Sequence, residues 1–274
     1  MGGLTAPSDL PGFERHARGR RSVLVRPEWR EALLDDLFAD FRTVSESARR
    51  IYSHGRVQHF SYRPEKGSGR VFVRRAARGG ALGALLGGLY AGTARPLLEL
   101  RAAARARDAG VSVPEPVAVL ADRAAGPFYR LTVVSREIEG GADLLSLAER
   151  LDPKAKGDLL RRVADEMRRL HEAGIYHSDL TLKNILVSGP SVYILDLDKA
   201  RLPGRREPAL DVANLSRLNR SVEKLFGGRG PITRTDKLRF LRRYLGTRDG
   251  LREFSLRCGA GMWKHRLWWA VTGA

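Results

Sequence analysis

The sequence contains 274 residues, of which 43% are hydrophobic and 29% are charged, and it carries a formal net charge of +18. This length and composition are typical of a folded chain with one large domain or two modest lobes, and they exclude a disordered protein. They also exclude a membrane-spanning protein, because the longest weakly polar run, GALGALLGGLYAG, is too short to cross a bilayer.

The expected location and partners depend on the same composition. The N-terminus has no apolar secretory segment and the single Cys258 cannot form an internal disulfide, so we expect a cytoplasmic protein. A large positive charge favours nucleic acid, an anionic membrane or a phosphorylated substrate as the partner. Because the basic residues are spread along the chain, a solvated basic surface explains the charge equally well.

The first half of the chain is predicted to be rich in strands. Residues 1–22, which contain many Gly, Pro and Arg, are predicted to form a flexible basic arm. Leu and Phe recur at helical spacing over 27–41, which predicts an accessory helix. Short β-prone runs over 55–75, broken by PEKGSG, indicate two or three antiparallel strands. A helix over 94–110 and strands within 117–138 follow.

The second half is predicted to be mostly helical. A helix over 152–174 places its apolar side chains on one face, and the short strand SVYILDL follows it. Beyond Asp211 the sequence is helical except at GGRGP. We therefore predict an α+β, bilobal fold with a small β-rich N-lobe and its accessory helix at 23–135, and a larger α-helical C-lobe at 136–274.

The segment between that helix and that strand carries residues suited to phosphoryl transfer. HSDLTLKNILV places His177, Asp179 and Asn184 at the spacing H-x-D-x-x-x-x-N, and ILDLDKAR supplies Asp196 where a metal-binding D-F-G would stand. A carboxylate can deprotonate or orient a hydroxyl, and amide and carboxylate oxygens suit magnesium. The alternative is that these Asp and Asn residues only form turns or caps. That role alone does not explain the amphipathic helix before the loop and the apolar strand after it. We predict Asp179 as the catalytic residue, with His177 bracing its loop.

A kinase site also needs a cation that holds phosphates and a carboxylate that holds the cation. Arg74 in VFVRR and Glu99 in RPLLELRAA are the candidates for this nucleotide-binding pair. Arginine is a planar fork where lysine is a point charge, so the nucleotide geometry is expected to differ from the common kinase pattern. The alternative for Glu99 is an exposed pair with Arg95, four residues earlier.

Glycines near the first strands are candidates for a loop that covers the phosphates. Gly55, Gly67 and Gly69 are assigned to nucleotide binding on this ground. None of them matches G-x-G-x-x-G, and ordinary hairpin turns explain them equally well.

Several motifs in the same order resemble the lipopolysaccharide core kinases, the family of Kdo (3-deoxy-D-manno-octulosonic acid) kinase and heptose kinase, from about Gly55 to Tyr244. VFVRRAARGG resembles the family's strand and R-G-G segment, and VSVPEPVAV resembles its V-P-x-P run. HSDLTLKNILV resembles H-x-D-L-x-x-x-N-I-L-V, ILDLDKAR resembles I-D-F-D-[KR]-[GA]-R, and NLSRLNRSVEKL resembles N-L-x-R-L-x-R-S-x-x-K.

The resemblance implies a protein-kinase-like fold and an ATP- and Mg²⁺-dependent kinase that phosphorylates a sugar hydroxyl, Kdo or heptose of a lipopolysaccharide inner core. It implies that Asp179 is the catalytic aspartate. It also implies that Asn184 and Asp196 bind magnesium and that Asp198 assists them, although a turn role explains Asp198 equally well.

The family's acceptor is attached to lipid A at the inner face of the cytoplasmic membrane. The resemblance therefore implies ATP and a lipid A-linked sugar as partners, peripheral contact with an anionic membrane, and no nucleic-acid partner. The C-terminal Trp263, Trp268 and Trp269 suit such a membrane contact, and a buried helix face explains them equally well.

Two other interpretations stay open. The chain could be a small-molecule or protein kinase of the same fold, although Ser178 and the lack of an A-P-E segment argue against a typical protein kinase. It could also be a catalytically inactive basic binding module. Asp179, Asn184 and Asp196 together argue against that module, because binding alone does not require all three.

Overall fold

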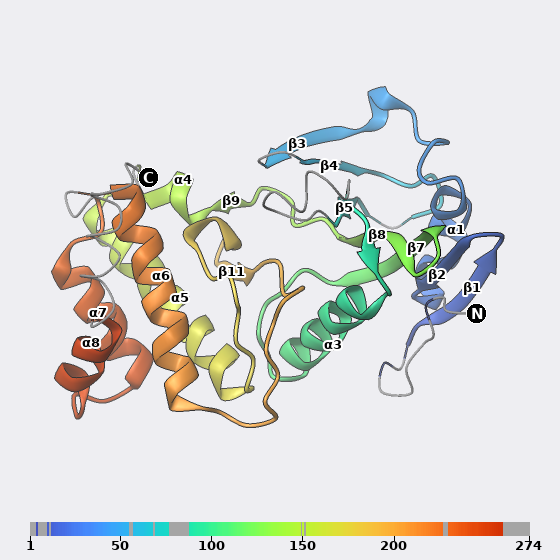
Figure 1. The fold of residues 1–274 in the computed structure, drawn as a ribbon. Coiled ribbons are helices and arrows are strands. Elements are labelled where there is room, and N and C mark those ends of the chain that lie inside the picture. The colour runs from blue at the N-terminus through green and yellow to red at the C-terminus, as the bar shows by residue number, and fades with distance from the viewer. Residues whose placement is uncertain are drawn as a thin grey trace, which may run out of the picture. The chain divides into compact units, whose positions relative to one another are not determined.

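The computed structural model describes residues 4, 10, 12–54, 57–67, 69–76, 88–148, 150, 152–226 and 230–259. The chain divides into two compact units. The first comprises Met1–Ala104 with Pro114–Ile138, and the second comprises Arg105–Val113 with Glu139–Ala274. Figure 1 shows most of the strands in the first unit and most of the helices in the second.

The first unit is built on an antiparallel sheet. Its strands are β1 (Glu14–Arg18), β2 (Arg21–Val25), β3 (Arg50–His54), β4 (Val57–Tyr62), β5 (Val71–Arg75), β6 (Tyr90–Ala91), β7 (Pro116–Ala125) and β8 (Phe128–Arg136). Their order is β1-β2-β7-β8-β5-β4-β3, and β6 also pairs with β8. The predicted strands over 55–75 and 117–138 are thus confirmed.

The prediction of a flexible arm over residues 1–22 is wrong for its second half. Residues 14–25 form the hairpin β1–β2, and β2 pairs along its whole length with β7. Leu4 and Leu10 are also buried in the core. The strand β2 was not predicted because it is short and lacks the alternation of apolar and polar residues. It is buried on both faces, so Val23, Leu24 and Val25 form a continuous apolar run.

Both faces of this sheet are covered, and the alternation of side chains sorts them into two cores. Val23 and Val25 join a cluster with Leu33 of the helix α1 (Arg30–Phe38), whereas Leu24 joins a cluster with Leu100 of the helix α3 (Ala94–Asp108). Successive residues of a strand point to opposite faces, so one strand serves both clusters. The helices predicted over 27–41 and 94–110 are confirmed, the first with a 3₁₀ turn at Pro27–Trp29 before it.

The second unit is mostly helical. Its elements are β9 (Ala142–Asp143), α4 (Leu144–Ala148), α5 (Pro153–Glu172), β10 (Ile185–Ser188), β11 (Ser191–Ile194), α6 (Pro208–Phe226), α7 (Arg234–Leu245) and α8 (Leu251–Gly259). The three strands form a small sheet in the order β11-β10-β9. Helix α7 packs against α5 and α8, and α6 packs against α8 (Figure 1). The predicted α+β class, with a β-rich and a helical part, is confirmed.

Helix α5 has defined ends that fix where the following loop begins. The Asp152 side chain accepts hydrogen bonds from the backbone N–H of Lys154 and Ala155, at 2.9 and 3.1 Å, and caps the N-terminus. At the other end Gly174 has φ 64°, and a Cβ there would lie 3.0 Å from the Arg205 carbonyl oxygen. Glycine is therefore required both by the left-handed backbone and by the close approach of a second segment.

Among the residues that the structure describes, no helix has the length and apolar character needed to cross a bilayer.

Candidate active site

His177 holds the start of the loop that follows α5. It is 2% exposed, and its Nε2 donates to the Leu195 carbonyl oxygen at 2.8 Å. Its Nδ1 accepts from the backbone N–H of Asp179 at 3.0 Å. Burial lowers the pKa of His177 although the Leu195 hydrogen bond and nearby carboxylates oppose the change. The imidazole is therefore neutral with both nitrogens engaged, which is the arrangement of a brace.

The loop closes on itself five residues later. The Asn184 side-chain amide donates to the Asp179 carbonyl oxygen at 2.7 Å, and the Asn184 backbone N–H donates to Thr181 at 3.1 Å. Only main-chain atoms of Asp179 take part in the Asn184 and His177 bonds. The Asp179 carboxylate is 64% exposed and lies 3.8 Å from the Arg217 guanidinium. The loop thus presents a carboxylate to solvent from a fixed backbone.

The segment after β11 lies against the same loop. The Leu195 backbone N–H donates to the Asn184 carbonyl oxygen at 2.9 Å, and the Ser178 hydroxyl donates to the Lys199 carbonyl oxygen at 2.5 Å. Asp196 is exposed and has φ 61°, a left-handed conformation that is costly for a residue other than glycine. A strained backbone conformation persists only where the surrounding structure holds it in place. Such conformations are concentrated at functional sites.

The donor set near Asp196 suits magnesium. Within the residues that the structure describes, no group of three or more His, Cys, Asp and Glu side chains could hold a metal ion. Magnesium does not require such a group, because it is usually bound by one or two carboxylates together with waters and substrate phosphates. The amide oxygen of Asn184 and the carboxylate of Asp196 fit this pattern. Asp198 is 6% exposed, which makes it a less accessible ligand than Asp196.

The predicted contact between Arg74 and Glu99 is confirmed. Arg74 lies on β5, Glu99 lies on α3, and one guanidinium nitrogen donates to both carboxylate oxygens. The two side chains are 20% and 13% exposed, so solvent screens the ion pair less than a surface pair. The contact provides a fixed cation on a strand, and its role in nucleotide binding stays a prediction.

The glycines proposed to cover the phosphates are only partly described. Gly67 and Gly69 lie in the connection between β4 and β5, where the Gly67 backbone N–H donates to the Pro64 carbonyl oxygen at 3.2 Å. This is a turn, and its role toward a nucleotide stays untested. Gly55 lies outside the described residues, as do the R-G-G segment and the three C-terminal tryptophans.

Helix α6 anchors both ends of the loop, which the sequence did not predict. Asn214 Oδ1 accepts from the His177 backbone N–H at 2.9 Å, and Ser221 Oγ accepts from the Leu182 backbone N–H at 3.2 Å. Both side chains belong to NLSRLNRSVEKL, whose recurrence in the family was the only signal available. The motif gives no direct sign that it contacts a loop nearly forty residues earlier.

A buried polar network surrounds the first of these anchors. His171 is fully buried, its Nε2 donates to Asn214 Oδ1 at 3.3 Å, and its Nδ1 accepts from the Tyr244 hydroxyl at 2.8 Å. Asp211 accepts from the Arg206 guanidinium at 2.7 Å and from the Tyr176 hydroxyl at 3.1 Å. The network joins α5, α6 and α7 at the base of the loop.

Acidification is expected to destabilise the protein through His171. Burial lowers the pKa of His171 to about 4 although the Asp211 charge and the Asn214 hydrogen bond oppose the change. Between this value and the ordinary histidine pKa of 6.5 the unfolded chain binds the proton and the native state does not. The contribution of neutral His171 to the free energy of unfolding is therefore present above pH 6.5 and is lost as the pH falls toward about 4. It amounts to on the order of 3 kcal/mol in total.

Urea unfolding at a series of pH values across that interval measures this effect. A His171→Gln variant should show a shallower dependence, because the contribution of His171 is removed while that of His177, whose pKa is lowered in the same direction, remains. An unchanged slope in the variant would contradict the assignment.

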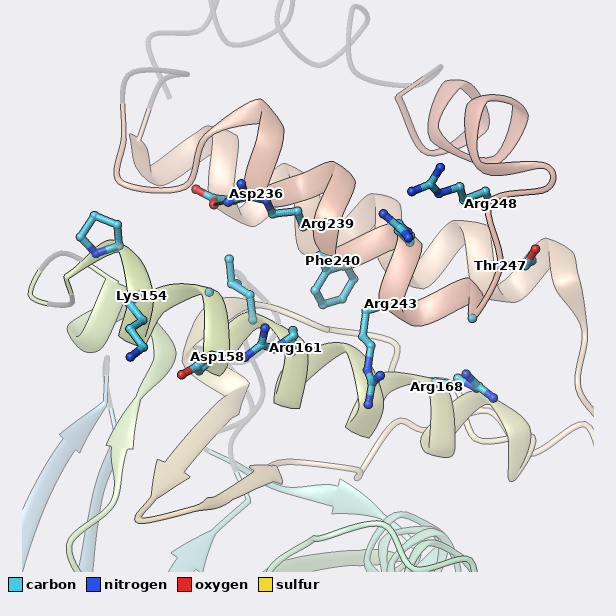
Figure 2. A pocket seen from close by; sticks show the side chains of 15 residues that line it. Lys154, Asp158, Arg161, Arg168, Asp236, Arg239, Phe240, Arg243, Thr247 and Arg248 are labelled. Carbon is cyan, nitrogen blue, oxygen red and sulfur yellow. Dashed lines mark hydrogen bonds and ion pairs between the residues drawn. The ribbon is translucent and has the colours of Figure 1, made fainter.

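The described part of the helical unit carries surface depressions, of which two matter for the site. One, of about 310 Å³, is lined by Asp179, Thr181, Lys183, Arg217, Arg220, Ser221, Lys224 and Leu225. The other, of about 790 Å³, lies between α5 and α7, and Figure 2 shows Phe240 pointing from α7 toward α5 inside it. Many of its arginines are neutralised locally. Arg243, for example, donates to both oxygens of Asp165 at 2.7 and 2.8 Å.

Comparison with solved structures defines the class of fold. WaaP in complex with acyl carrier protein has a TM-score of 0.59 to this chain at 24% identity, with 89% of this chain and 96% of that chain covered. The likeness shows that the fold is protein-kinase-like, as predicted. Together with the H-x-D-x-x-x-x-N loop, it defines a kinase.

Residues 55–244 match the lipopolysaccharide kinase (Kdo/WaaP) family, and the chain belongs to that family. The 3-deoxy-D-manno-octulosonic acid kinase of Vibrio cholerae serotype O1 is 32% identical over 163 residues, which cover 58% of this chain and 67% of that protein. The kinase of the same name from Vibrio vulnificus is 31% identical over 157 residues, which cover 56% and 64%. The matched segments thus span about two thirds of these relatives. The predicted family is confirmed, and the chain is a phosphotransferase of the sugar kinase class.

Proposed function

We propose that the protein transfers the γ-phosphoryl group of ATP to a hydroxyl of Kdo in a lipopolysaccharide inner core. The observation that carries the proposal is the loop in which main-chain bonds to His177 and Asn184 hold Asp179 with its carboxylate exposed. The names of the curated relatives favour Kdo over heptose as the acceptor.

In the proposed mechanism the acceptor hydroxyl attacks the γ-phosphorus and the bond to the β-phosphate oxygen breaks. Asp179 orients the hydroxyl and accepts its proton, and ADP leaves with the electron pair of the broken bond. His177 and Asn184 keep Asp179 in place through its main chain. The products are ADP and the sugar phosphate.

Other residues bind the nucleotide in this proposal. Arg74, oriented by Glu99, contacts nucleotide phosphates. Asn184 and Asp196 hold a magnesium ion, which neutralises charge on the phosphates when it is bound.

The acceptor is proposed to be attached to lipid A, so the protein would work at the cytoplasmic face of the membrane. The net charge of +18 supports peripheral contact with anionic lipids at that surface.

Mass spectrometry of a Kdo-lipid A acceptor incubated with the protein, ATP and magnesium tests the function. The expected product is heavier by one phosphate, and an acceptor in which heptose is the terminal sugar serves as the comparison. Phosphorylation of the heptose acceptor alone would overturn the choice of Kdo. Phosphorylation of neither, with ATP turnover intact, would overturn the lipopolysaccharide acceptor.

The Asp196→Asn variant is expected to weaken magnesium-dependent binding of ADP by about tenfold or more, because a charged ligand becomes a neutral one. Calorimetric titration with ADP in the presence and absence of magnesium measures the change without relying on turnover. Binding without magnesium should be unaffected. Wild-type affinity in the presence of magnesium would exclude Asp196 as a ligand.

A further inference from the structure

The pocket beside Asp179 is strongly basic. Lys183 follows Asp179 in the same loop, and Arg217, Arg220 and Lys224 line the pocket from α6. The three helix residues are separated by three and four positions, so they lie along one face. This set of cations is called the α6 basic pocket below.

Most of these cations have no acidic partner among the residues that the structure describes. Arg217 lies 3.8 Å from the Asp179 carboxylate, whereas no ion pair to Lys183, Arg220 or Lys224 occurs within the described ranges of the chain. Like charges at helical spacing repel one another. Burial and, to a smaller extent, the charge of Arg217 lower the pKa of Arg220, so its environment disfavours the cation as the pocket now stands. A bound anion would relieve this repulsion.

The second groove offers a useful contrast. There Arg161 pairs with Asp158, Arg168 pairs with Glu172 and Arg243 pairs with Asp165 (Figure 2 shows the arginines). In that groove Lys154, Arg242 and Arg248 have no ion pair among the described residues, so unpaired cations alone do not single out a site. The α6 basic pocket is smaller, three of its four cations are unpaired within the described residues, and it includes the residue proposed to act on the acceptor hydroxyl.

We propose that the α6 basic pocket binds an anionic group of the acceptor, a carboxylate or a phosphate, and so places the acceptor hydroxyl beside Asp179. This inference rests on the proposed function and adds the residues that hold the anionic group of the acceptor. The volume of about 310 Å³ is at the lower end for ligand sites, so it suits one acidic sugar rather than a whole glycolipid.

The anionic group could belong to the sugar or to lipid A, and the two sources differ in their distance from the reacting hydroxyl. Kdo carries a carboxylate on the same ring as its hydroxyls, and lipid A carries phosphates outside that ring. Because Arg217 contacts Asp179 itself, an anion held by Arg217 and its neighbours on α6 lies close to the reacting hydroxyl. Arg220 and Lys224 are then acceptor-binding residues, and Arg217 is a positioning residue for both the anion and Asp179.

The test is a double variant, Arg220→Gln with Lys224→Gln, compared with Arg242→Gln and Arg248→Gln in the second groove. Both pairs remove two positive charges, and Arg242 and Arg248 are exposed. We expect the first pair to raise KM for the Kdo-lipid A acceptor by about tenfold to a hundredfold, since charge-assisted hydrogen bonds are lost. KM for ATP should stay constant, and the second pair should behave as the wild type.

Modified acceptors identify the anion. If the pocket holds the sugar carboxylate, the KM difference between wild type and variant should vanish with a Kdo methyl ester acceptor. If it holds a lipid A phosphate, the difference should vanish with a dephosphorylated lipid A acceptor. An unchanged KM in the α6 double variant, or the same rise in the second-groove variant, would overturn the assignment.

Calorimetric titration with free Kdo separates this inference from the proposed function. Kdo binding that is lost in the α6 double variant, without phosphate transfer by the wild type, would support the pocket and overturn the proposed reaction. Phosphate transfer with equal KM in both proteins would overturn the pocket and leave the reaction.

Discussion

The Asp179→Asn variant is expected to lose phosphoryl transfer by about a thousandfold while it keeps its fold and its nucleotide affinity. The amide cannot accept the hydroxyl proton. The loop should survive, because the bonds to His177 and Asn184 use the main-chain N–H and carbonyl oxygen of Asp179. Steady-state kinetics with the Kdo-lipid A acceptor and thermal unfolding with ADP measure the two properties.

Asp249→Asn is a suitable control for that variant. Asp249 is also exposed, and its hydrogen bond to Thr247 uses the Asp249 backbone N–H. The same chemical change there should leave kcat at the wild-type level. Wild-type turnover by Asp179→Asn would show that another group accepts the proton.

The Asp211→Ala variant is expected to lower the free energy of unfolding by about 2–3 kcal/mol, because it removes the buried carboxylate that accepts from Arg206 and, among the described residues, leaves that guanidinium only the longer ion pair with Glu172 at 3.8 Å. Asp211 is 2% exposed and also accepts from the Tyr176 hydroxyl. For a chain of this size the loss corresponds to a fall in Tm of roughly 5–10 °C. Urea and thermal unfolding measure both quantities.

Asp165→Ala provides the matched comparison. Asp165 accepts two hydrogen bonds as Asp211 does, but both come from Arg243, and this ion pair is exposed to solvent. Exposed pairs contribute little to stability, so its unfolding should be close to that of the wild type. Equal losses of unfolding free energy in the two variants would contradict the larger contribution expected from the buried Asp211.

The parts of the fold that the sequence predicted are those with long periodic patterns. The helix α5 carries Leu159, Val163, Met167 and Leu170 on one buried face, and its ends are marked by Asp152 and a glycine. The hairpin β1–β2 carries no such pattern, since one strand is mostly exposed and the other is buried on both faces. Burial on both faces becomes visible only when the neighbouring strands are placed.

The candidate site also divides into residues that a local sequence pattern reveals and residues that only the folded structure brings together. The loop residues could be recognised because they lie within one short segment of fixed spacing, and Arg74 could be matched with Glu99 because a kinase requires that pair. The roles of Asn214 and Ser221 could not be predicted, because they contact the loop from a helix that begins about twenty residues after it ends. The α6 basic pocket was missed for the same reason.

Neighbouring positions of α6 carry separate tasks. Asn214 and Ser221 bond to the backbone of the loop, whereas the cations Arg217, Arg220 and Lys224 line the pocket, at whose edge Ser221 also lies. Because different side chains perform the two tasks, the pocket-facing positions can be exchanged while the bonds that hold Asp179 persist. Divergence of acceptor preference among relatives, or its deliberate redesign, would then require changes on one stripe of a single helix and no rebuilding of the catalytic loop.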